Sequence, residues 1–109
     1  MKIIVNGIEW VIILTKDSEN LKRSDGTITL GVTDLNCKCV FLWAELEPYM
    51  LRKVLIHELS HVFIFSYGYS MTLDEEEFLC SFIDTYASDI INLTESTLKT
   101  SFGKISKFS

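Results

Sequence analysis

The period of the hydrophobic residues changes near residue 47, and this change limits the folds that the 109-residue chain can adopt. Before it, short apolar runs rich in Ile and Val are separated by turn signals, of which Asn6-Gly7 is the strongest and Asp25-Gly26 the second. The runs predict strands over four ranges: 2–5, 8–14, 27–33 and 37–43. Because the connections are short, we expect a small, mostly antiparallel sheet of three or four strands.

After residue 47 the apolar residues follow helical spacing, and two long helices are predicted. The first begins at Pro48, where the missing N–H of proline costs nothing, and ends at Gly68. The second begins with a capping box, in which Thr72 caps the helix and Glu75 reaches back. The polar residues 94–109 are expected to form a tail or a short third helix.

A chain of this length has room for one hydrophobic core. Its 48% apolar and 23% charged residues are typical of a globular protein and argue against disorder. We therefore predict an α+β fold, with a small sheet packed on two long helices. The domain is expected to span residues 1–93, followed by a tail or short helix over 94–109.

Charge and cysteine content limit the partners and the compartment. A net charge of −5 makes nucleic acid an unfavourable partner, because binding there requires clustered Lys and Arg. The apolar run Trp10–Leu14 is far shorter than the ~20 residues of a membrane span, and no signal-peptide pattern is visible. We expect neither insertion into a membrane nor export. We therefore interpret Cys37, Cys39 and Cys80 as reduced thiols in a cytoplasmic protein. Buried free thiols are favoured over a second metal site.

The chain has two histidines, in the run His57-Glu58-Leu59-Ser60-His61 of the first predicted helix. A spacing of four residues puts both imidazoles on the same helix face, where they can share one Zn²⁺. Glu58 lies beside that pair, where it can hold a zinc-bound water and accept its proton. This pattern is the HExxH motif of zinc peptidases. The alternative is a structural histidine pair without a metal.

A catalytic zinc needs a third protein ligand, and downstream of His61 this must be an acid because no histidine remains. An acidic run opens the second predicted helix. The helix dipole explains Asp74 and Glu75 there, whereas Glu76 and Glu77 remain candidate ligands. Their spacing does not choose between them.

The order of a small sheet, an HExxH helix and a glutamate-bearing helix resembles the gluzincin-type zinc peptidases. It is most similar to the compact ImmA/IrrE-like family and its small relatives in phages and mobile elements. The resemblance covers roughly residues 37–91 and rests on two motifs: His57–His61 with the following Val62-Phe63-Ile64-Phe65, and Glu77-Phe78-Leu79-Cys80-Ser81.

In that family the ligand glutamate is followed at the third position by a small residue and at the fourth by a polar one. Cys80 and Ser81 match these positions after Glu77, which makes Glu77 the expected ligand and Glu76 the alternative. The fourth residue is more often Asn or Asp, which supports a histidine ligand. Ser81 is a weaker residue for that role.

The resemblance implies a zinc metallopeptidase in which Glu58 is catalytic and His57, His61 and Glu77 bind the metal. It suggests regulatory proteolysis of a repressor-type protein, with a peptide or protein as substrate. The alternative function is a non-catalytic zinc-binding module that binds a host or phage protein.

Two further expectations concern the substrate. The resemblance implies that the strand Cys37–Trp43 lines the cleft, where an extended substrate adds to its edge; an ordinary core strand is the alternative. Tyr67, Tyr69 and Tyr86 are candidates for stabilising an oxyanion, with packing as the alternative role for each.

Overall fold

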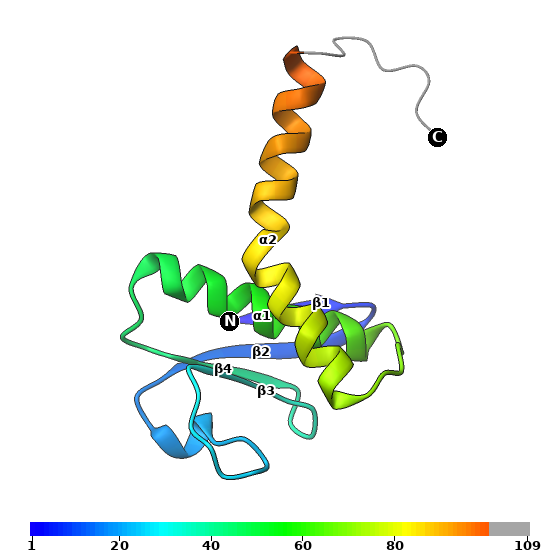
Figure 1. Ribbon diagram of the computed structural model, residues 1–109. Helices are drawn as coiled ribbons and strands as arrows, with labels where there is room; N and C mark the ends of the chain where they lie inside the picture. Colours follow the sequence, from blue (N-terminus) through cyan, green and yellow to red (C-terminus); the bar gives the residue numbers. More distant parts are fainter. Residues whose placement is uncertain (101–109) are drawn as a thin grey trace.

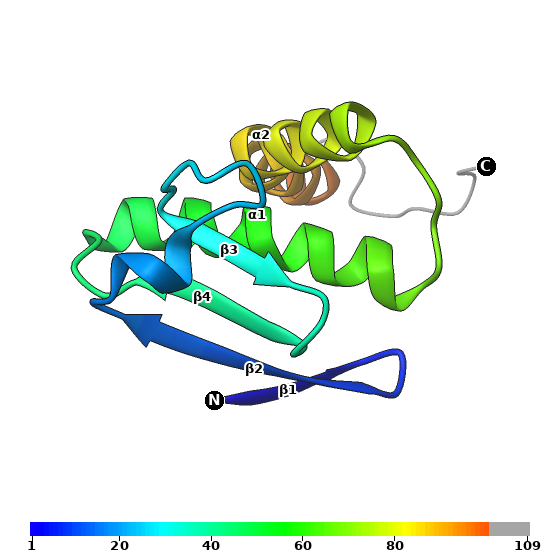
Figure 2. The same ribbon diagram turned by 90° about the horizontal axis from the view of Figure 1, so that it is seen from below.

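A four-stranded sheet is formed by the first half of the chain, and two helices form the second half (Figure 1). The computed structural model describes residues 1–100. The strands are β1 (Lys2–Val5), β2 (Ile8–Thr15), β3 (Gly31–Asp34) and β4 (Cys39–Trp43), with a short 3-10 helix η1 (Ser18–Leu21) after β2. The helices are α1 (Pro48–Ser66) and α2 (Leu73–Thr100). Figure 2 shows three layers, in which α1 covers one face of the sheet and α2 lies over α1.

The strand order is β1-β2-β4-β3. Antiparallel pairing joins β1 to β2 and β3 to β4, whereas β2 and β4 are parallel. The predicted α+β fold with a mostly antiparallel sheet is confirmed. The turn between β1 and β2 contains Asn6 at φ 49° and Gly7 at φ 76°, the left-handed pair that a tight hairpin requires.

The position of β4 corrects one prediction. Both edges of β4 are occupied, by β2 on one side and β3 on the other. An extended substrate therefore cannot add to the strand predicted over Cys37–Trp43, and that expectation is wrong. The edge strands of the sheet are β1 and β3.

The core lies between the sheet and α1. Its buried apolar side chains are Val5, Trp10, Val40, Leu42 and Val62. The indole Nε1 of Trp10 donates a hydrogen bond of 3.0 Å to Ser66 Oγ, which fixes the last turn of α1 against β2. Helix α1 ends as predicted, with Gly68 at φ 73° and its N–H donated to the Phe65 carbonyl at 3.0 Å.

Helix α2 begins as predicted and ends later than predicted. Glu75 N–H donates to Thr72 Oγ1 at 3.2 Å, and Thr72 N–H donates to Glu75 Oε1 at 2.9 Å, which confirms the capping box. Residues 94–100 continue α2, whereas a tail or separate helix was expected there. No glycine or proline occurs between Thr72 and Thr100, so nothing in the sequence stops the helix. The rest of that predicted segment, 101–109, lies outside the described residues.

Within residues 1–100, neither helix combines the length and the apolar character that crossing a membrane requires.

Candidate metal centre

Three side chains from the two helices converge on one point. His57 and His61 of α1 and Glu77 of α2 each offer one ligand atom, and these atoms all lie within 4.8 Å of one another. His57 Nε2 is 3.3 Å from Glu77 Oε2, and His61 Nε2 is 3.0 Å from Glu77 Oε1. Ligands about 2.0–2.2 Å from a tetrahedral Zn²⁺ stand roughly 3.3 Å from one another. The three residues expected as ligands are thus brought together at distances that a metal ion fits.

The other ring nitrogen of each histidine is held by a carboxylate. His57 Nδ1 is 2.7 Å from Asp84 Oδ2, and His61 Nδ1 is 2.5 Å from Glu76 Oε2. Since a carboxylate only accepts, each Nδ1 carries a proton, and in the neutral imidazole the nitrogen with the lone pair is then Nε2, which lies toward Glu77. This orientation of both rings is the usual arrangement around a histidine-bound metal.

The charges around this point favour the binding of a cation. Lone pairs of two imidazoles and of the Glu77 carboxylate face one another at about hydrogen-bond distance, with Glu76 and Asp84 close behind. Without a proton or a metal ion between them, these lone pairs repel. Side chains of the two histidines are only 11–15% exposed, so water screens the repulsion poorly. A divalent cation would satisfy all three groups at once.

Asp84 was not identified from the sequence. It follows Glu77 by seven residues, two helical turns, which places both carboxylates on the same face of α2. Burial acts to raise the pKa of Asp84, but hydrogen bonds from Lys53, His57 and Thr85 outweigh it and lower that pKa below 3.8. Asp84 is therefore the ionised partner that orients His57.

The supporting role expected of Ser81 falls to other residues. Ser81 is exposed, and the two histidines donate instead to Asp84 and Glu76. Glu76, the alternative third ligand, thus lies behind His61, whereas Glu77 offers its carboxylate to the shared point. The sequence signal that could have identified Asp84 is its spacing of seven residues from Glu77.

Replacing Asp84 with alanine is expected to lower the affinity of the site for an added metal ion, with Zn²⁺ as the probe, by about 10–100-fold, because His57 loses the carboxylate that orients its ring. The measurement is competition for zinc against a chromophoric chelator. Asp89→Ala removes an exposed acid from the same helix and should bind zinc like the wild type. Equal affinity of the Asp84→Ala and Asp89→Ala variants would show that Asp84 does not support the site.

Glu58 lies against strand β3. Its side chain is buried, with 6% of the residue exposed, and Thr33 Oγ1 donates to Glu58 Oε1 at 2.9 Å. The same hydroxyl is 3.1 Å from the Glu58 carbonyl. A Cβ on Gly31 would come within 2.6 Å of Val54 Cγ1 and 3.2 Å of Glu58 Oε2, so only glycine leaves room for this approach. Neither Gly31 nor Thr33 was found from the sequence, because their contact with Glu58 depends on how β3 packs against α1.

Burial is the main cause that raises the pKa of Glu58 above its ordinary value of 4.5, and the Glu77 carboxylate adds to it. The Thr33 hydrogen bond and the two histidines act in the opposite direction. A carboxyl with a raised pKa in the folded state stabilises the fold below its unfolded pKa, and this contribution is lost as the pH rises through the folded value.

We therefore expect Glu58→Gln to raise the melting temperature of the metal-free protein at pH 7–8 by about 4–8 °C, the equivalent of roughly 1 kcal/mol. The glutamine keeps an oxygen that accepts from Thr33 and has no charge to desolvate. Differential scanning calorimetry in chelator checks the shift, which should shrink towards pH 4 as Glu58 becomes protonated. A melting temperature lowered equally at both pH values would contradict this electrostatic account.

The tyrosines proposed as oxyanion donors face apolar surface. Tyr67 and Tyr69 line a groove together with Phe63. Tyr86 packs against Phe82, with ring centroids 5.1 Å apart, and helical spacing puts it about 180° from Glu77 on α2. Tyr86 thus has the packing role that was the alternative for it. Tyr67 and Tyr69 are 53% and 70% exposed, and their role as oxyanion donors stays a prediction.

The three cysteines are free thiols. Cys80 is buried, as expected, whereas Cys37 is exposed at the turn before β4. Burial, reinforced by Glu76, Glu77 and other nearby carboxylates, raises the pKa of Cys80 to about 12. Within residues 1–100, the cluster of potential metal ligands contains no cysteine.

Comparison of the chain with protein-family models, with curated proteins and with solved structures gives no match. The functional inference therefore depends on the residues and geometry described above.

Proposed function

We propose that this protein is a zinc-dependent peptidase. The observation that carries the proposal is the convergence of His57, His61 and Glu77 beside the buried Glu58. Two imidazoles and one carboxylate, with a further coordination position open, are the ligand set of catalytic zinc in several peptidases. The spacing of the ligand atoms and the two supporting carboxylates fit that ion.

Zinc in such a site would lower the pKa of a coordinated water and polarise the carbonyl of the scissile peptide. The chain's own contribution is the placement of Glu58. Thr33 donates a hydrogen bond to Oε1 of Glu58, which orients the carboxylate. Glu58 then accepts a proton from the attacking water and passes it to the leaving amine. Its raised pKa lies closer to neutral pH than the pKa of an ordinary glutamate, which favours both proton transfers.

Strand β3 supplies the surface for an extended substrate. It is an edge strand of the sheet, and its residues Gly31 and Thr33 lie against Glu58. A peptide that adds to this edge through main-chain hydrogen bonds would run past the general base. The substrate class is therefore an extended segment of a protein, and the resemblance to the ImmA/IrrE-like family favours a repressor-type protein of a phage or mobile element.

The experiment that tests this function is a search for peptides cleaved by the zinc-loaded wild type and not by Glu58→Gln. A metal analysis of protein purified without a histidine tag accompanies it. About one zinc per chain, absent from His57→Ala, is the expected composition. No zinc in the wild type even after reconstitution would overturn the proposal.

A further inference from the structure

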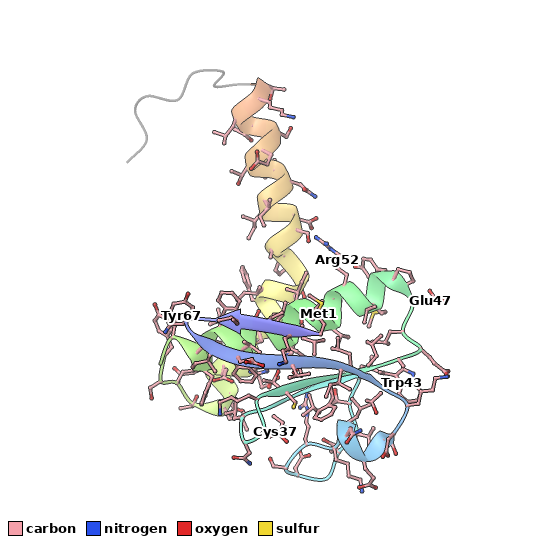
Figure 3. All side chains as sticks on the ribbon, turned by 180° about the vertical axis from the view of Figure 1, so that it is seen from behind. Met1, Cys37, Trp43, Glu47, Arg52 and Tyr67 are labelled. Carbon is pink, nitrogen blue, oxygen red and sulfur yellow. The ribbon has the colours of Figure 1, made fainter. Side chains whose placement is uncertain are left out.

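Helix α2 extends well beyond the rest of the protein. It crosses α1, and its second half projects from the layers of the fold (Figure 1). The hydrogen bond of 3.1 Å from Arg52 to Ser88 lies near the point where α2 leaves α1, and Figure 3 shows the side chains beyond it standing clear of the other elements. A helix of about 12 residues is marginal in water by itself, because its stability normally comes from packing of an apolar face.

The projecting helix carries such a face. Five large apolar residues follow one another at spacings of three and four residues and form the α2 stripe: Leu79, Phe82, Tyr86, Ile90 and Leu93. The last four are 46%, 50%, 52% and 70% exposed. Glu77 and Asp84 lie on the opposite side of the helix, facing α1. The stripe is thus apolar, uncharged and turned away from the metal centre.

One end of the stripe opens into an apolar groove. Leu79 lines a hollow of about 410 Å³ together with residues of α1 and the α1–α2 connection. Among these, Phe63 and Tyr67 stack with their ring centroids 6.0 Å apart and are about half exposed. The stripe and the groove form one continuous apolar surface.

The stripe is symmetric about Tyr86. Phe82 and Ile90 lie four residues on either side of it, and Leu79 and Leu93 lie seven residues on either side. An antiparallel copy of α2, related by a two-fold axis at Tyr86, would therefore place Leu93 against Leu79 and Ile90 against Phe82. A surface that matches itself in this way is what a two-fold interface requires.

We propose that this surface binds a second copy of the same chain. In this dimer the two α2 helices pair antiparallel about Tyr86, and Leu93 of each copy fills the Leu79 groove of the other.

The available area is sufficient for a stable dimer. Seven side chains of the stripe and groove are between 46% and 70% exposed: Phe63, Tyr67, Tyr69, Phe82, Tyr86, Ile90 and Leu93. At about 150–250 Å² for a whole aromatic side chain, they present roughly 700 Å² per chain. Two copies would bury roughly 1,400 Å², within the range of about 1,200–2,000 Å² for specific interfaces.

The test is the mass of the full chain in solution, measured by light scattering across a dilution series. The wild type is expected to have twice the mass of one chain, and Leu93→Glu to weaken dimerisation at least about tenfold. Asn92→Glu adds the same charge one residue away, on the polar side of α2, and should remain a dimer. Far-ultraviolet circular dichroism and zinc content show that each variant is still folded. A monomeric wild type, or equal dissociation of both variants, would overturn the proposal.

The register has its own test. With Cys37 and Cys39 replaced by serine, Tyr86→Cys should form a disulfide between two chains on mild oxidation, because the axis brings residue 86 of both copies together. Asn92→Cys should not. A dimer that cross-links through residue 92, and not through 86, would exclude the antiparallel arrangement about Tyr86.

Discussion

Replacing Glu58 with glutamine is expected to abolish peptide cleavage and to leave zinc bound. The glutamine is nearly isosteric and still accepts the Thr33 hydrogen bond, so the position of the side chain is kept. It cannot accept a proton from water, and the loss of a general base lowers the rate by about 10²–10⁴-fold. The measurement is the rate of cleavage of library peptides by mass spectrometry, with zinc content determined on the same samples.

Glu95→Gln is the matched control, since Glu95 is an exposed glutamate of α2 far along the chain from the metal centre. It should cleave like the wild type. Equal cleavage by Glu58→Gln and wild type would remove Glu58 from the role of base. If no peptide is cleaved and the biological effect of the protein survives Glu58→Gln, the interaction-module function takes the place of the peptidase.

Removal of zinc is expected to lower the melting temperature by about 10 °C or more. An ion bound at 100 times its dissociation constant stabilises the folded state by about 2.7 kcal/mol, and each kcal/mol corresponds to about 4–8 °C in a domain of this size. A large effect is expected because the candidate ligands come from both helices. An ion bound there would join α1 to α2 and relieve the repulsion among the lone pairs of these ligands.

Thermal denaturation of the zinc-loaded protein, with and without excess chelator, measures this shift. His61→Ala, which lacks one ligand, should melt at a temperature that the chelator hardly changes. No shift in the wild type, after metal removal has been verified by elemental analysis, would show that the site is not coupled to the fold.

The order of the strands could not be predicted from local patterns. The alternation of apolar residues and the Asn6-Gly7 turn correctly predict β1, β2 and the hairpin between them. The same patterns do not show that β4 inserts between β2 and β3 with parallel pairing to β2. That arrangement depends on contacts between residues far apart in the sequence. Because of it, the strand to which we expect a substrate to add is β3 and not β4.

What the sequence alone determined is local. Helical spacing puts His57 and His61 on one face of α1, and the capping box of Thr72 and Glu75 sets the start of α2, because both follow from interactions within one or two turns.

Only the tertiary structure decided which groups complete the site. The crossing of α2 over α1 brings Glu77 to the shared point, sends Glu76 behind His61 and places Asp84 on His57. The packing of β3 against α1 brings Thr33 to Glu58. These contacts join residues 15 to 27 positions apart that belong to different elements. Spacing along the chain carries no information about the angle at which two packed elements meet.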